Sequence, residues 1–98
     1  MVITWLKSAR EDLHNIYKFI AKDSEYYAKK VLNDFFDATE ILNLFPKSGR
    51  VVPETDREEL REIIIYSYRL IYKIKENEIL VMVLLNSKQL IKRTRLKE

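Results

Sequence analysis

The cationic side chains near the C-terminus are the residues whose type and spacing point most directly to chemistry. Between positions 86 and 98 there are five basic residues and one acid, so this segment carries +4 while the rest of the chain sums to −1; the basic residues are Lys88, Lys92, Arg93, Arg95 and Lys97. Clustered ammonium and guanidinium groups attract phosphate backbones and acidic protein surfaces alike. We therefore expect a polyanionic partner at this end, with a solvated, frayed terminus as the alternative.

Groups that transfer protons or bind metals are scarce in this sequence. His14 is the one histidine, and cysteine is absent. Zinc and iron sites usually need imidazole or thiolate ligands, so we expect neither a metal site nor another cofactor. Because His14 follows Leu13 at the edge of an apolar helix stripe, we interpret it as an incidental surface residue. The lack of cysteine also excludes disulfides and favours a reducing compartment.

Length and composition indicate one folded domain. The chain has 98 residues, 47% of them apolar, with one glycine and two prolines. These values support one modest core and argue against disorder, so we expect a single domain over residues 1–98 with a basic C-terminal tail. The N-terminal residues Met1–Trp5 do not read as a signal peptide, and no apolar run has the length of a membrane span. We therefore predict a cytoplasmic protein with no membrane partner.

Two amphipathic helices are predicted in the N-terminal half. Ser8, with Glu11 three residues later, forms a capping box that opens a helix ending near Lys22. Ser24 caps a second helix, in which apolar residues recur every three or four positions until Pro46 ends the run. A single residue separates the two helices, so they must double back as an antiparallel hairpin with their apolar stripes facing a common surface.

The C-terminal half is predicted to form strands. A segment rich in turn formers separates it from the helices, and there Gly49 is expected to supply a positive φ. Three apolar runs follow, joined by tight connections into an antiparallel meander: Leu60–Tyr66, Tyr68–Lys75 and Ile79–Leu85. Val2–Trp5 adds an edge strand. The helix hairpin is the one available cover for this sheet, so we predict a two-layer α+β fold.

Arg69 and several aromatic residues each allow two interpretations. Arg69 falls in a predicted strand, where it is either a functional cation or the outward polar face of a half-exposed strand. Trp5, Tyr66, Tyr68 and Tyr72 have the ring systems that stack on nucleic-acid bases. Strand aromatics more often pack in a core or against cross-strand neighbours, however, and we expect these residues to pack.

Five pieces of the sequence occur in an order and spacing that are informative together. The first is the opening, made of Ile3–Trp5, Ser8–Leu13, Ile16–Tyr17 and Phe19–Ala21; the others are Leu44–Arg50, Val52–Glu54, Leu60–Glu62 and Tyr68–Tyr72. This series resembles the ParE toxins of the RelE/ParE superfamily over nearly the whole chain, to about Leu90. The resemblance implies the toxin of a type II toxin–antitoxin system, with a helical hairpin packed on a small twisted antiparallel sheet. It also implies a cognate antitoxin as partner and a role in plasmid stabilization.

The resemblance implies one of two activities. ParE-like members bind and poison DNA gyrase without bond-breaking chemistry of their own, whereas RelE-like members are endoribonucleases that cut messenger RNA in the ribosome. If the chain is RelE-like, the resemblance assigns Arg61, Arg69 and Lys88 as catalytic cations that stabilise the charge of the transition state. Such chemistry also needs a group that moves protons, and no tyrosine or histidine follows Tyr72.

The missing proton-transfer group and the long helix hairpin favour gyrase over the ribosome and messenger RNA as the target. On this interpretation the target-binding residues are Lys88, Lys92, Arg93, Arg95 and Lys97. The mRNA endoribonuclease is the alternative, and it is the one enzymatic activity under consideration. A nucleic-acid-binding module that is not a toxin is the third possibility, since it would explain the basic tail equally well.

Overall fold

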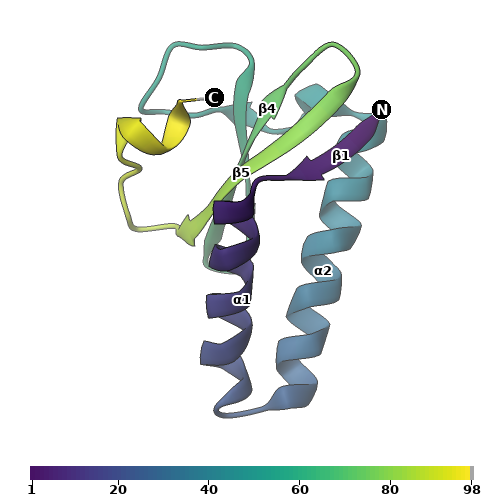
Figure 1. The fold of residues 1–98 in the computed structure, drawn as a ribbon, viewed down its shortest axis with the longest axis vertical. Coiled ribbons are helices and arrows are strands. Elements are labelled where there is room, and N and C mark those ends of the chain that lie inside the picture. Colours follow the sequence, from purple (N-terminus) through teal and green to yellow (C-terminus); the bar gives the residue numbers. More distant parts are fainter. Residues whose placement is uncertain (98) are drawn as a thin grey trace.

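A computed structural model describes residues 1–97, which form two α-helices and a five-stranded sheet (Figure 1). In chain order the elements are β1 (Val2–Trp5), α1 (Lys7–Ala21), α2 (Glu25–Leu44), the 3-10 turn η1 (Pro46–Ser48), β2 (Arg50–Val51), β3 (Leu60–Ile65), β4 (Tyr68–Ile74), β5 (Glu78–Asn86) and the 3-10 turn η2 (Arg93–Leu96). The predicted α+β fold, a helix hairpin packed on a sheet, is confirmed.

The strand order in the sheet is β1-β5-β4-β3-β2. The predicted meander is present, because β3, β4 and β5 pair antiparallel in sequence. The predicted edge strand β1 joins the sheet by pairing in parallel with β5, with Val2 opposite Glu78 and Trp5 opposite Val81. The sheet is therefore mixed rather than wholly antiparallel. Two helices and three strands intervene between β1 and β5, so no hairpin turn imposes an antiparallel pair.

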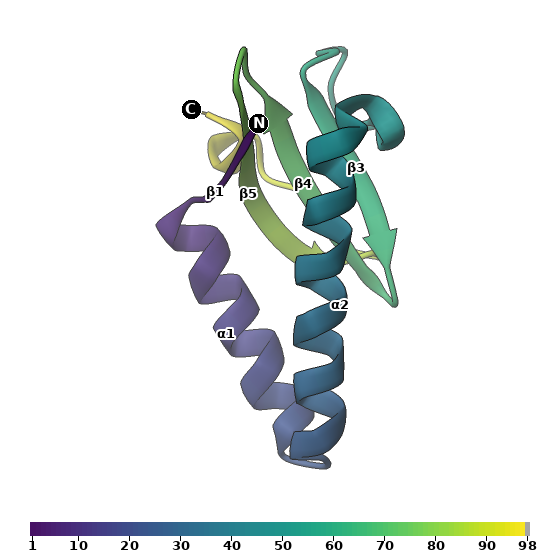
Figure 2. The same cartoon turned by 90° about the vertical axis from the view of Figure 1, so that its right-hand side faces the viewer.

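The helix hairpin forms as predicted, except at its first residue. The Ser24 hydroxyl accepts the Tyr27 N–H at 3.1 Å and caps α2, and the two helices extend beyond the sheet (Figure 2). The predicted Ser8 cap is wrong, because α1 begins before it and its N-cap is Leu6, which makes no side-chain cap. The N–H of Leu6 instead donates to the Val81 carbonyl at 2.9 Å. Pairing with β5 thus continues to Leu6, and the helix begins directly after it, before Ser8.

Apolar side chains pack on both faces of the sheet. The helix-covered face holds the larger cluster, whose buried members include Leu13, Phe35 and Tyr72. The opposite face carries a second cluster, which is closed by Ile91 and Leu96 from the C-terminal segment. In Figure 2 this segment lies behind the sheet, on the side away from α2. The helix hairpin is therefore not the sole cover, and the interpretation of a frayed terminus is wrong.

The composition of β5 explains the second cover. Every residue from Ile79 to Leu84 is buried, so this strand presents apolar side chains to both faces of the sheet. A strand of this kind requires packing on each side, whereas a half-exposed strand alternates apolar and polar residues. The C-terminal segment supplies the packing that the helices cannot reach.

Gly49 has a packing role instead of the predicted conformational one. Its φ is −78°, so the expected positive φ is wrong. The Tyr72 hydroxyl accepts the Gly49 N–H at 3.1 Å and donates to the Pro46 carbonyl at 2.6 Å. A Cβ at position 49 would lie 2.6 Å from both this hydroxyl and the Glu62 carbonyl oxygen. Glycine is therefore required by the close approach of its neighbours.

The predicted packing of the aromatic residues is confirmed. Trp5 meets Phe36 edge to face, Tyr68 meets a buried phenylalanine in the same way, and Tyr72 is fully buried. Tyr66 is 44% exposed, but its ring meets Tyr27 of α2 edge to face and its hydroxyl donates to Asp34 on the same helix. These rings hold the helices against the sheet.

Candidate functional site

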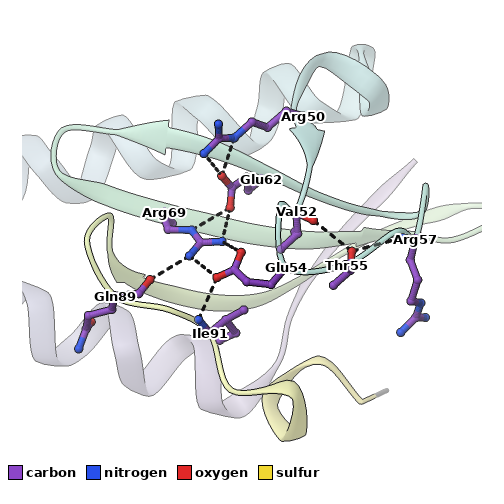
Figure 3. A network of polar contacts seen from close by, with 9 residues as sticks. All are labelled: Arg50, Val52, Glu54, Thr55, Arg57, Glu62, Arg69, Gln89 and Ile91. Carbon is purple, nitrogen blue, oxygen red and sulfur yellow. Dashed lines mark hydrogen bonds and ion pairs between the residues drawn. The ribbon is translucent and has the colours of Figure 1, made fainter.

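Arg69 on β4 lies at the centre of a buried network of charges (Figure 3). Its side chain is 5% exposed. Nη1 and Nη2 donate to the two carboxylate oxygens of Glu54 at 2.8 and 2.7 Å, and Nε donates to Glu62 Oε1 at 2.8 Å. The other Glu62 oxygen accepts Arg50 Nε at 2.7 Å. Two guanidinium groups and two carboxylates thus alternate, and each charge meets its opposite.

Strand alternation places this network on the face that the C-terminal segment covers. Arg69 and Ile71 point to the same side of β4, and Ile71 belongs to the second apolar cluster. Glu62 is paired with Ile71 across β3 and β4, so its side chain points to that side too. One of the two interpretations of Arg69 was the outward polar face of a half-exposed strand. Arg69 does face away from the helices, but the C-terminal segment covers the surface there. A charge in this position must be paired.

Electrostatics keep Glu54 and Arg69 ionised. The hydrogen bonds from Arg69 lower the pKa of Glu54 to about 2, against the opposing effect of burial, and the Ile91 N–H assists. The same carboxylates raise the pKa of Arg69. Glu54 is therefore anionic throughout the physiological range, and the Arg69 cation is neutralised by its own chain.

Besides the packing of Ile91 and Leu96, side-chain polar contacts attach the basic C-terminal segment to the fold at two places. At its start, the Gln89 carbonyl accepts Arg69 Nη1 at 2.9 Å and the Ile91 N–H donates to Glu54 Oε2 at 3.1 Å. Further on, Arg95 Nη2 lies 2.7 Å from Asp12 Oδ2 on α1. That same oxygen accepts the Leu84 N–H of β5 at 3.0 Å.

Four of the five predicted target-binding residues present exposed cations on this attached segment: Lys88, Lys92, Arg93 and Lys97. The fifth, Arg95, is half-buried and pairs with Asp12. Four exposed charges on an attached main chain form a surface that can bind an anionic partner with little loss of main-chain conformational entropy.

The three residues assigned to RelE-like catalysis are not gathered into one site. Arg61 is paired across the strands with Tyr72, so it points to the helix-covered face, opposite to Arg69. There Nη2 lies 2.6 Å from Glu58 Oε2, and Nη1 donates to the Gly49 carbonyl at 3.1 Å. Lys88 lies in the turn after β5 and is exposed. Two of the three cations are thus occupied by intramolecular partners on opposite faces of the sheet.

Neither a metal site nor a membrane-spanning helix is found in residues 1–97. No three of their histidine, cysteine, aspartate or glutamate side chains come together as metal ligands would. None of the helices in this range combines the length and apolar character needed to cross a bilayer. His14 is exposed on α1, as its interpretation as a surface residue requires.

A protein-family comparison identifies the chain. Residues 3–91 match the family described as the ParE toxin of the type II toxin-antitoxin system parDE. The chain belongs to the ParE toxin family. A chain of a solved structure described as the chromosomal ParDE TA system from P. aeruginosa is similar, with a TM-score of 0.71 and 19% sequence identity. The match covers 88% of this chain and 95% of that chain. At this identity the likeness shows a shared fold alone. No curated protein matches the sequence significantly.

Sequence reasoning missed three acidic residues of this ParE-type toxin. Glu54 and Glu62 hold Arg69, and Asp12 holds Arg95, but none was assigned a role. One local signal was present, because Glu62 interrupts the apolar run of β3 at a position where burial is expected. A buried glutamate in a strand must have a cationic partner. Nothing in the sequence alone indicated which cation that would be.

Proposed function

We propose that this ParE-type toxin of a type II toxin–antitoxin system acts by binding DNA gyrase through its basic C-terminal segment, and that a cognate antitoxin neutralises it. The partner is recognised by the four exposed cations of the segment, which suit an acidic protein surface. The toxin on this account breaks no covalent bond.

The environment of Arg69 is the observation that carries this proposal. A catalytic cation must be free to meet the developing charge of a phosphoryl transition state. The Arg69 guanidinium already donates to two carboxylates and a backbone carbonyl and is almost completely buried. Withdrawing it would leave buried carboxylates uncompensated, at a cost of several kcal/mol. These contacts therefore support binding over RNA cleavage.

The last tyrosine of the sequence supports the same choice. Burial raises the pKa of the Tyr72 hydroxyl, which is occupied by Gly49 and Pro46. A general acid or base needs access to the substrate and a pKa near neutrality. Tyr72 meets neither condition, so it is not suited to move a proton to or from a bound messenger RNA.

The antitoxin would bind as a segment that folds on the toxin. One receiving surface is a groove of about 280 Å³ beside α1, where Ile16, Phe19 and Leu85 supply apolar lining and Gln89 marks the start of the basic segment. Apolar antitoxin residues would occupy the groove and acidic ones would meet the neighbouring cations. The outer edge of β1 is the other candidate surface, since an edge strand can accept a further strand.

The proposal is tested by removing the charges without removing the fold. In one variant, Lys88, Lys92, Arg93 and Lys97 are replaced by glutamine. A control variant carries the same replacement at four exposed lysines elsewhere: Lys18, Lys22, Lys29 and Lys47. We expect the first variant to lose inhibition of DNA supercoiling by purified gyrase and to permit growth, while the control retains both effects.

Two results would contradict the proposal. Equal loss of inhibition in both variants would show that general positive charge, and not the C-terminal segment, governs activity. Cleavage of translated messenger RNA by the wild type, with supercoiling unaffected, would establish the endoribonuclease instead.

Co-expression of the antitoxin should restore growth of cells that express the wild-type toxin.

A further inference from the structure

The turn that leads from β5 into the basic segment is held by two side chains from distant parts of the sequence. Arg69 Nη1 donates to the carbonyl of Gln89, and Glu54 accepts the N–H of Ile91 (Figure 3). Arg69 and Glu54 are joined to each other by a bidentate pair. Their ion pair therefore holds the main chain on both sides of Leu90.

Apolar packing contributes little to this turn. Leu90 is 82% exposed, and burial resumes only at Ile91, which is 8% exposed. Within the turn itself the Gln89 N–H donates to the Asn86 carbonyl at 2.9 Å. A segment with few buried apolar contacts opens locally at low free-energy cost. The Ser87 N–H also donates to the Ser67 carbonyl at 2.7 Å, and the side chains of Asn86 and Gln89 accept N–H groups within the turn. These contacts fix the turn as far as Gln89, and Arg69 and Glu54 fix the path of the chain from Gln89 to Ile91.

Glu54 is itself fixed by the loop that carries it. Val52 is fully buried in the second apolar cluster, and its carbonyl accepts both the N–H of Thr55 at 2.9 Å and the Thr55 hydroxyl at 3.2 Å. This tight turn encloses Glu54. The carboxylate is therefore presented from a rigid loop rather than from a mobile one.

We propose that Glu54, acting through Arg69 and the Ile91 N–H, is the positioning residue that sets the basic segment in its target-binding arrangement. This inference rests on the proposed function, in which the exposed cations of the segment contact gyrase. Glu54 does not touch the target. It removes conformational freedom from the segment before binding, so that less entropy is lost when the complex forms.

The test compares Glu54→Gln with Glu76→Gln in the full chain. Glu76 lies exposed in the turn between β4 and β5, and the described residues show no ion pair or hydrogen bond of its side chain. Amide hydrogen exchange is followed by NMR, and affinity for purified gyrase is measured in parallel. Glu54→Gln should speed exchange of the Ile91 amide by about tenfold or more, the order expected when a hydrogen bond to a charged acceptor is lost. Exchange in α2 and β4 should stay near the wild-type rate.

Affinity for gyrase should fall by about fivefold to tenfold in Glu54→Gln and stay unchanged in Glu76→Gln. Glu54→Asp keeps the charge but shortens the side chain by one methylene, and it should give intermediate values. If Glu54→Gln does not fold, the same measurements are made on Glu54→Asp. A positioning role predicts faster exchange at Ile91 alone. A merely structural role predicts that the slowly exchanging amides of α2 and β4 would accelerate together with it.

Three outcomes would contradict the positioning role of Glu54. Unchanged exchange at Ile91, or equal acceleration throughout the protein, would overturn the positioning role of Glu54 whatever happens to gyrase binding. Faster exchange at Ile91 with wild-type affinity would also overturn it, since a loosened segment would then bind equally well. Failure of the proposed function appears elsewhere, as undiminished gyrase binding by the variant with four glutamines in the basic segment.

Discussion

The two faces of the sheet are covered by different means. On one face, two amphipathic helices bury a continuous apolar cluster that includes Phe35 and Leu42. On the other, a short C-terminal segment contributes Ile91 and Leu96, and the charges around Arg69 hold its start. The first arrangement secures the fold mainly through buried apolar area. The second is small, depends on specific polar contacts, and carries the cations through which we propose that the toxin binds its target.

The largest effect is expected on the helix-covered face. Phe35 is fully buried among residues from both helices and the sheet. Phe35→Ala should lower the free energy of unfolding by about 3–5 kcal/mol, because it removes a large apolar side chain and leaves a cavity. Urea denaturation followed by circular dichroism would measure this loss. A change below about 1 kcal/mol would mean that this face is not the main source of stability.

Arg69→Ala should have the next largest effect, and it acts on the opposite face. The substitution leaves Glu54 and Glu62 without their shared cation, although Arg50 still neutralises Glu62. We expect a loss of about 3 kcal/mol in unfolding free energy, together with loosening of the basic segment. Toxicity should therefore fall strongly even without a catalytic role. The reason is that Arg69 anchors the start of the basic segment.

Leu96→Ala should give a smaller and more local effect. Leu96 is 5% exposed and closes the second apolar cluster from η2. Because the segment can detach while the helices and sheet remain folded, the loss of global stability should be about 1–2 kcal/mol, below the usual range for a core leucine. Hydrogen exchange would show faster rates in residues 91–97 and little change in α2. Equal acceleration in both regions would show that the two faces unfold together.

Acidification should produce the smallest effect near neutral pH. The pKa of Glu54 is lowered from 4.5 to about 2, so its contribution to stability is complete above about pH 4.5 and is lost as the pH falls toward 2. Between pH 5 and 8 we expect no loosening of the turn at Ile91 from this group. A fluorescent label on the basic segment should report increased mobility only under acid conditions. Release near pH 6 would mean that another group controls the attachment.

The elements that could be predicted from the sequence are those with a local signal. Ser24, the apolar periodicity and Pro46 predicted α2. Apolar runs joined by tight turns predicted the strands of the meander. The start of α1 was misplaced because a contact between Leu6 and Val81, far apart in sequence, decides it. At this position the backbone pairing of Leu6 with β5 determines where the helix begins, and the capping preference of Ser8 does not.

The site was less predictable than the fold for the same reason. The basic residues were visible as a charge cluster, but their attachment depends on contacts of Arg69 with Glu54 and Gln89, which lie 15 and 20 positions away. No periodicity or motif encodes such a meeting. A residue of an open strand face was consequently one of two interpretations of Arg69, because nothing in the sequence indicated that the C-terminal segment returns to cover it.

The most direct test of the central claim is hydrogen exchange of the wild-type toxin with and without purified gyrase. The account predicts that gyrase slows exchange in the segment from Lys88 to Lys97, while amides at the exposed tip of the helix hairpin keep their rates. The four-glutamine variant of this segment should show no such protection. Protection confined to the helix hairpin, or none at all at saturating gyrase, would contradict the claim that the basic segment binds the target.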